Sequence, residues 1–209
     1  PKKGYSELRQ SQSVDPDFMR AKNEMDLKIG KYMIRDWRTR DSSSIAKYAN
    51  KKNIWANLRD GFPHPYQLSD AENFLSNVAH QNPRTIFAIA DNQGAIGSIG
   101  LRLGEDVHRF TAEMGYWLAE PFWNKGIMSK IVIRFNEFAF EKFALNRIFA
   151  EPYTENTASV RVLEKAGFVL EGTLKANAFK DGKVLDQFLY SKIGHEIRKP
   201  YAASQIVFR

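Results

Sequence analysis

The most informative stretch of the chain is Glu113-Met-Gly-Tyr-Trp-Leu-Ala-Glu-Pro-Phe-Trp-Asn-Lys-Gly-Ile-Met-Ser-Lys130. It predicts a strand that ends near Leu118, a tight loop, and a strongly apolar helix that begins near Ile127. The free amide groups and the positive dipole end of a helix start form an anion site, and Gly126 would let a phosphate approach the backbone. The spacing is that of neither a Walker A loop nor a dinucleotide-binding fingerprint. A plain strand–turn–helix with one loop lysine, Lys125, is the alternative reading of these residues.

Outward from this stretch, the pattern of apolar residues predicts one mixed sheet flanked by helices, an α/β fold in the mixed α+β sense. Strands are expected at residues 26–35, 85–90, 95–103, 110–118, 147–151, 169–174 and 187–193. Helices are expected from Asp41 through Ala49, from a capping box at Ser69, from Ile127 to Lys142 and from Thr157 to Ala166. The proline-rich segment 60–66 is expected to be a stiff loop. Asp181-Gly182 is a turn signal, in a connection that we expect to be longer than a minimal hairpin.

The composition fits one globular domain. The chain has 209 residues, of which 43% are hydrophobic and 26% charged, and this excludes a wholly disordered or fibrous protein. We expect an irregular arm at residues 1–25, the domain at 26–195 and a tail at 196–209. The absence of cysteine excludes a disulfide framework and a cysteine nucleophile, and the four scattered histidines have no metal-ligand spacing, so no metal is expected.

The charge and hydropathy of the chain restrict its partners. The net charge of +7 predicts attraction to an anionic ligand, or serves solubility alone. The basic runs are too short to mark a nucleic-acid groove, so no specific nucleic acid is expected. No apolar run is long enough to span a bilayer, which favours a cytoplasmic protein without a membrane partner. The oligomeric state is open, with a homodimer as one option.

Three segments carry a resemblance to a known family. They are Phe62-Pro-His-Pro-Tyr66, Gly115-Tyr-Trp-Leu-Ala-Glu-Pro-Phe-Trp-Asn-Lys-Gly126 and Asn156-Thr-Ala-Ser-Val-Arg-Val-Leu-Glu-Lys-Ala-Gly-Phe168. In this order and spacing the chain resembles the GCN5-related N-acetyltransferases (GNAT), and within them the Rim-type branch of ribosomal-protein N-terminal and spermidine acetyltransferase-like enzymes. The resemblance covers most of residues 26–193. It implies a central, mostly antiparallel sheet of six to seven strands with about four helices.

The resemblance also implies acetyl-CoA as co-substrate and an amine as acceptor. The family's acyl-CoA motif, [Q/R]-x-x-G-x-[G/A], falls on Trp123-Asn-Lys-Gly-Ile-Met128, where the glycine matches and Met128 replaces a small residue. By family analogy, the pyrophosphate is expected against Trp123, Asn124, Lys125, Gly126, Ile127, Met128 and Ser129. Backbone groups of Tyr116, Trp117 and Leu118 are expected to face the pantetheine arm, and Asn156 to contact it.

Direct transfer from a thioester to an amine requires a base and a proton donor. An alkylammonium with a pKa of ~10 has no free lone pair, and the departing thiolate needs a proton. Glu113 is the base candidate by family analogy, while an ion pair with Arg102 or Arg109 is the alternative role for this carboxylate. Ser159 is the candidate partner of the thiolate. Many family members place a tyrosine acid where this chain has Leu163, and Tyr190 is a weaker substitute.

The sequence says least about the residues that bind the acceptor amine. His64 and Tyr66 would line the acceptor wall if the proline loop folds as in the family, together with Tyr190 on the last strand. A histidine between prolines is otherwise more often structural. The acceptor is expected to be a small amine, a polyamine or a protein N-terminus.

Two other functions compete with acetyl transfer. Asn124, Met128 and Leu163 depart from the usual family pattern, which would suit a non-catalytic acyl-CoA binding or sensing module. The net charge would suit a nucleic-acid-binding accessory protein, which predicts a steep salt dependence of binding.

Overall fold

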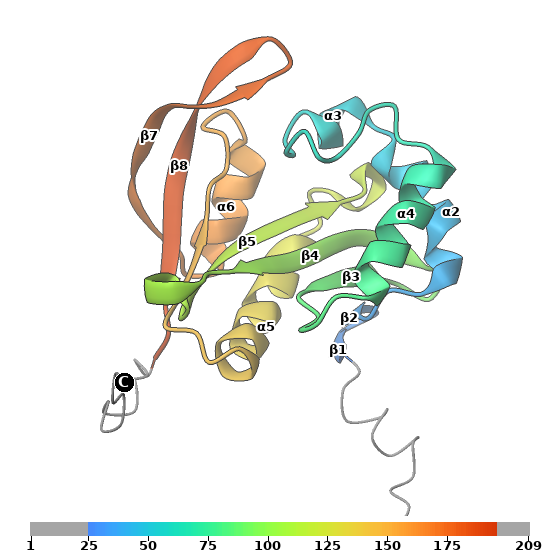
Figure 1. Ribbon diagram of the computed structural model, residues 1–209, viewed down its shortest axis with the longest axis horizontal. Helices are drawn as coiled ribbons and strands as arrows, with labels where there is room; N and C mark the ends of the chain where they lie inside the picture. The colour runs from blue at the N-terminus through green and yellow to red at the C-terminus, as the bar shows by residue number, and fades with distance from the viewer. Residues whose placement is uncertain (1–24, 196–209) are drawn as a thin grey trace, which may run out of the picture.

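Strand β5 (Thr111–Leu118) lies near the middle of an eight-stranded sheet in a computed structural model that describes residues 25–195 (Figure 1). The strand order is β1-β2-β3-β4-β5-β6-β8-β7, and every neighbouring pair is antiparallel except β5 and β6. The other strands are β1 (Asp26–Ile29), β2 (Tyr32–Arg35), β3 (Ile86–Ala90), β4 (Ala95–Leu103), β6 (Arg147–Ala150), β7 (Val169–Lys180) and β8 (Lys183–Ile193). The predicted mixed α/β domain is confirmed, with one or two more strands than expected.

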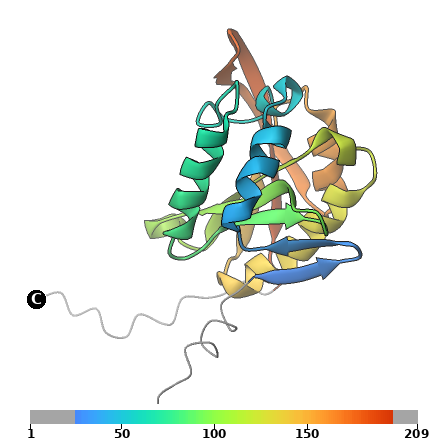
Figure 2. The same ribbon diagram turned by 90° about the vertical axis from the view of Figure 1, so that its right-hand side faces the viewer.

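Five α-helices in the described part of the chain form the outer layers: α2 (Ser42–Ala49), α3 (Lys52–Trp55), α4 (Leu68–Ala79), α5 (Ile127–Lys142) and α6 (Thr157–Lys165). Helices α2 and α4 cover one face of the sheet, and α5 and α6 cover the other (Figures 1 and 2). Short 3-10 turns lie at Thr39–Asp41, Asp106–His108 and Glu120–Phe122. Among the described helices, none is both long and apolar enough to cross a membrane.

The apolar stripe of α5 builds the larger of two cores. Ile131, Val132 and Phe135 are fully buried, and Phe135 meets Phe87 of β3 edge-on with ring centroids 5.9 Å apart. Met25, the last residue of the expected arm, is also buried in this core. Residues 1–24 and 196–209, which contain the rest of the arm and the expected tail, lie outside the described residues.

Two predictions about strands were wrong, and in both cases a two-residue turn is the reason. Residues 26–35 form a hairpin rather than one strand, because Gly30 adopts φ +62° and reverses the chain. The connection at Asp181-Gly182 is a minimal hairpin, since both residues have positive φ (50° and 76°) and β7 and β8 extend up to them. Strand β7 extends beyond the expected strand at residues 169–174. Its second half was not recognised because register shifts in β7 break the alternation of its side chains.

Two helix starts also differ from expectation. The capping box of α4 begins at Gln67 and closes on Asp70, two residues before the predicted Ser69. Helix α3 was not predicted, because a single turn is too short to show a period. Asp41 precedes α2 as expected, but its side chain makes no cap bond to that helix.

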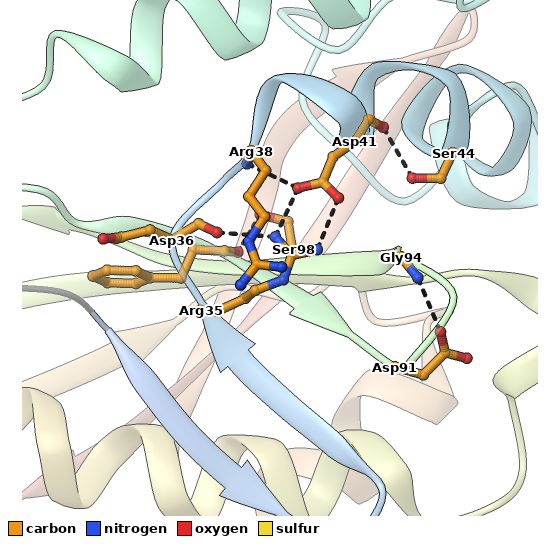
Figure 3. A network of polar contacts seen from close by, with 9 residues as sticks. Arg35, Asp36, Arg38, Asp41, Ser44, Asp91, Gly94 and Ser98 are labelled. Atoms are coloured by element: carbon orange, nitrogen blue, oxygen red, sulfur yellow. Dashed lines mark hydrogen bonds and ion pairs between the residues drawn. The ribbon is translucent and has the colours of Figure 1, made fainter.

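The Asp41 carboxylate instead forms a buried ion pair that joins β2 to α2 (Figure 3). The two terminal nitrogens of Arg35 donate to its two oxygens at 2.7 and 2.8 Å, and the backbone amide of Arg38 donates at 2.9 Å. The side chains of Arg35 and Asp41 are 5% and 1% exposed. Three donors therefore compensate for the removal of this carboxylate from water.

We expect Asp41→Ala to lower the free energy of unfolding by about 3–5 kcal/mol, because Arg35 would remain buried without a counter-charge. Urea unfolding measures the loss. Asp36→Ala is the matched control, since the Arg84–Asp36 pair is 50% and 21% exposed and is expected to contribute less than about 1 kcal/mol. Equal losses in the two variants would contradict the importance of the buried pair.

Candidate active site

The sheet opens between β5 and β6. The two strands pair only at Thr111–Arg147, Ala112–Ile148 and Glu113–Phe149, whereas β5 remains paired with β4 as far as Leu118. Backbone groups of residues 114–118 that point toward β6 therefore have no sheet partner. A cleft of about 1390 Å³ runs through this opening and is lined from both faces of the sheet.

The turn before α5 forms one end of this cleft. Asn124 and Gly126 have left-handed backbones, with φ of 57° and 67°, and no side chain caps the helix. The first amides of a helix have no intrahelical acceptor, and here no side chain replaces one. The helix dipole adds positive potential at the same point. A Cβ built on Gly126 would meet no protein atom within 4 Å. The turn thus has free donors and open space, as an anion site requires.

Three residues of this turn differ in how they are used. The indole nitrogen of Trp123 donates to the carbonyl of Leu118 at 2.6 Å, which fixes the ring at the rim of the cleft. The Lys125 ammonium donates to the carbonyl of Pro121 at 2.8 Å, and the residue does not line the cleft. Met128 lines the cleft, is 7% exposed and packs in the larger core. Asn124, Ile127 and Ser129 also belong to the lining.

A hydroxyl pair lies on the α6 side of the opening. The phenol of Tyr116 and the hydroxyl of Ser159 are 2.8 Å apart. Ser159 is held in place because its amide donates to the side-chain oxygen of Asn156, which caps α6. Burial raises the pKa of Tyr116 above its ordinary value, with a smaller opposite effect from Ser159, so this phenol keeps its proton.

The tyrosine side chain at 116 was missed in the sequence, where only its backbone was considered. Alternation along β5 could have indicated it, because Glu113 and Tyr116 differ by an odd number of positions and so point to opposite faces. Leu163, at the position of the usual family tyrosine, is fully buried.

Carboxylates lie on the opposite, α3-facing side of the opening. Glu113 is directly opposite Arg102 in the β4–β5 register, and its two oxygens accept hydrogen bonds from Arg59 and Arg102. The alternative role as partner of Arg102 is therefore present in the structure, while Arg109 bonds to the carbonyl of Asp106 instead. Glu151, which the sequence reading missed, lines the same side. Burial, followed by the neighbouring Glu113 charge, raises the pKa of Glu151, and the two arginines partly offset this.

The predicted acceptor residues separate into two groups. Tyr66 lines the cleft, packs on Phe62 with ring centroids 4.8 Å apart, and has its pKa raised to about 12 by burial and by Asp70. His64 does not line the cleft and stacks on Trp55 at 5.4 Å. Tyr190 is 4% exposed, donates to Glu164 at 3.2 Å, and also lies outside the lining.

The tip of the β7–β8 hairpin contacts α3 and the loop that follows it, on the side of the opening where Glu113 and Glu151 lie. The Lys180 side chain is only 2% exposed, and its ammonium lies 2.8 Å from Asp60 and 4.0 Å from the centroid of the Trp55 ring. A buried cation is stabilised by such a pair of partners. The contact fixes the hairpin tip relative to the loop that carries Arg59.

The profile of the Acetyltransferase (GNAT) domain family matches residues 31–169, about two thirds of the chain. The chain belongs to the GNAT acetyltransferase family. An uncharacterized N-acetyltransferase of Bacillus subtilis, YoaA, is 35% identical over 101 residues, which are 48% of this chain and 56% of that protein. The chain thus matches little more than half the length of this relative.

Solved GNAT structures have the same fold. A ribosomal-protein-S5-alanine acetyltransferase from Vibrio fischeri superposes with a TM-score of 0.73 at 23% identity, covering 84% of this chain and 100% of that one. A spermidine N-acetyltransferase from Vibrio cholerae, in complex with CoA and spermine, gives 0.67 at 24% identity over 79% and 96%. Both kinds of enzyme belong to the branch expected from the sequence.

We expect Gly126→Ala to weaken coenzyme A binding by about tenfold or more, or about 1.4 kcal/mol, because the new methyl group would occupy the space open to a diphosphate. Titration calorimetry with coenzyme A measures the change. Gly30→Ala is the matched control, since Gly30 has nearly the same φ (62°) and equally open surroundings in the β1–β2 turn. Both variants should lose about 1–2 kcal/mol of stability from backbone strain. Unchanged affinity in the Gly126 variant would exclude the turn as the diphosphate site.

Proposed function

We propose that this protein transfers an acetyl group directly from acetyl-CoA to a primary amine. The observation that carries the proposal is the opening between β5 and β6, with the Tyr116–Ser159 hydroxyls on one face and Glu113 and Glu151 on the other. Such an opening lets a thioester lie across the sheet, with proton donors on one side and proton acceptors on the other.

The donor would bind along the opening. The amides of residues 124–129 hold the pyrophosphate, and Lys125 adds positive charge near the turn even though its ammonium bonds to Pro121. Unpaired backbone groups of β5 hold the pantetheine arm as an added strand would. The Leu118 carbonyl is already engaged by Trp123, and the backbone of Trp117 faces β4. The backbone groups of Tyr116 and the amide of Leu118 therefore remain for the arm. Asn156 uses its side-chain oxygen for the α6 cap and keeps its amide group for the arm.

Transfer would proceed in one addition–elimination sequence. The amine loses a proton to a carboxylate and attacks the thioester carbonyl, forming the C–N bond. A backbone amide at the opening stabilises the oxyanion. The C–S bond then breaks, and the thiolate takes its proton from the Tyr116–Ser159 pair. The nitrogen loses its second proton, which restores the hydroxyl pair through solvent, and an acetamide and coenzyme A remain. Tyr116 thus takes the role that Leu163 cannot fill.

The amine acceptor is supported by family membership and by the acidic groups of the acceptor face. The structural relatives are named for a ribosomal-protein alanine and for spermidine, so peptides with a free N-terminus and polyamines are the first acceptors to test.

Turnover is measured by thiol release from acetyl-CoA with a panel of polyamines, amino acids and N-terminal peptides. The chain contains no cysteine, so a thiol reagent gives no signal from the protein itself. Binding of coenzyme A without turnover on any amine would favour a non-catalytic acyl-CoA module, to which the buried Leu163 points. Absence of coenzyme A binding would exclude both functions.

We expect Tyr116→Phe to lower kcat by about 10²–10⁴-fold, because the leaving thiolate would lose its proton donor. Coenzyme A affinity should change little, since the aromatic ring remains. Tyr190→Phe is the matched variant, because it removes a phenol outside the cleft. If Tyr190→Phe reduces kcat and Tyr116→Phe does not, the proton donor has been misassigned.

A further inference from the structure

We propose that Glu151 is the group that takes the proton from the acceptor amine, and that Glu113 is a positioning residue. This inference rests on the proposed acetyl transfer. It departs from the sequence-based expectation, which assigned the base to Glu113.

Glu113 is poorly placed to accept a proton, because both of its oxygens are already in use. Arg59 from the loop after α3 donates to one oxygen, and Arg102 from β4 donates to the other. The Glu113 side chain is 14% exposed. Protonation would break one of two charge-assisted hydrogen bonds and leave an arginine without its partner. This arrangement suits a residue that ties the α3 loop to the sheet.

Glu151 has the opposite character. It follows β6 directly and lies two residues beyond Phe149, the last residue that pairs with β5, so strand alternation places it on the same side as Glu113. Its backbone is fixed, because its carbonyl accepts a hydrogen bond from Gln187 at 2.6 Å and Pro152 follows. Within residues 25–195, no hydrogen bond or ion pair engages its half-buried carboxylate, which lines the cleft. A fixed backbone with an unengaged carboxylate is what a proton acceptor requires.

The charges around Glu151 fit the same role. Partial burial and, to a smaller extent, the charge of Glu113 raise the pKa of Glu151, which makes it a stronger base than an ordinary glutamate. Arg59 and Arg102 oppose this shift and help to keep the carboxylate ionised. The same loop also carries Glu155 and Tyr153, and burial raises the pKa of the Tyr153 phenol as well. Glu113 thus affects the reaction through its charge and through the two arginines.

The nitrogen loses two protons in the proposed transfer. The acceptor ammonium gives the first to the Glu151 carboxylate, which returns it to solvent, and the freed lone pair forms the C–N bond. As the C–S bond breaks, the thiolate takes a proton from the Tyr116–Ser159 pair, and the second proton of the nitrogen restores that pair through solvent, so one proton is released and one ends on coenzyme A.

The test compares Glu151→Gln with Glu113→Gln at saturating acetyl-CoA across pH. We expect Glu151→Gln to lower kcat by about 10²–10³-fold near neutral pH. The loss should shrink as pH approaches the pKa of the acceptor amine, and it should be smaller for acceptors of lower amine pKa, because solution then supplies the deprotonated amine. Coenzyme A affinity should not change.

Glu113→Gln is expected to raise KM for the acceptor and to show a deficit that pH does not repair. Glu72→Gln is the control, since Glu72 is an exposed carboxylate on α4 outside the cleft lining, and its pH profile should follow the wild type. Urea unfolding shows whether each variant remains folded.

Wild-type kcat in Glu151→Gln, or a pH-repairable loss in Glu113→Gln alone, would overturn the assignment while leaving acetyl transfer intact. No turnover by the wild-type protein on any amine would instead refute the proposed function itself.

Discussion

The separation of β5 from β6 after Glu113 is the constraint on which the rest of the site depends. β5 follows β4 instead, and the two approach so closely that a Cβ on Gly97 would lie 2.3 Å from the carbonyl oxygen of Trp117. On the other side, Pro152 has no amide with which to continue a ladder, and β6 ends at Ala150. The opening is therefore produced by close packing on one side and by a proline on the other.

The two faces of this opening differ chemically because side chains alternate along β5. Tyr116 points toward α6 and reaches Ser159, whereas Trp117 points toward the α2 and α4 face and meets Phe62 with ring centroids 6.0 Å apart. One strand thereby supplies a buried phenol to the α6 side of the cleft and an aromatic wall to the α2 and α4 side. The structure needs no loop rearrangement to keep the two sets of groups apart.

Much of the fold could be predicted from local signals, but long-range contacts could not. The α5 stripe and the turn at Gly126 are visible in the sequence because they depend on nearby residues. The pairing of Glu113 with Arg59 joins residues 54 positions apart, and Lys180 meets Asp60 across 120 positions. Glu151 is followed by a proline and belongs to no motif, so only the three-dimensional arrangement shows that it lies beside Glu113. The 26–35 hairpin was missed because Gly30-Lys31 interrupts the alternation for only two residues.

The cleft passes through the sheet, and this affects the order in which the two substrates of the proposed transfer can bind. Since the lining includes groups from both faces of the sheet, the acyl donor and the nitrogen nucleophile can arrive from opposite sides without blocking each other. In the proposed transfer neither would have to leave before the other enters, so a ternary complex could form. Coenzyme A would then depart by the route through which it came, and the acylated product by the other. The Lys180–Asp60 contact joins the β7–β8 hairpin to the loop after α3 beside that second route, so the proposed acceptor side is bounded by segments 120 positions apart in the sequence.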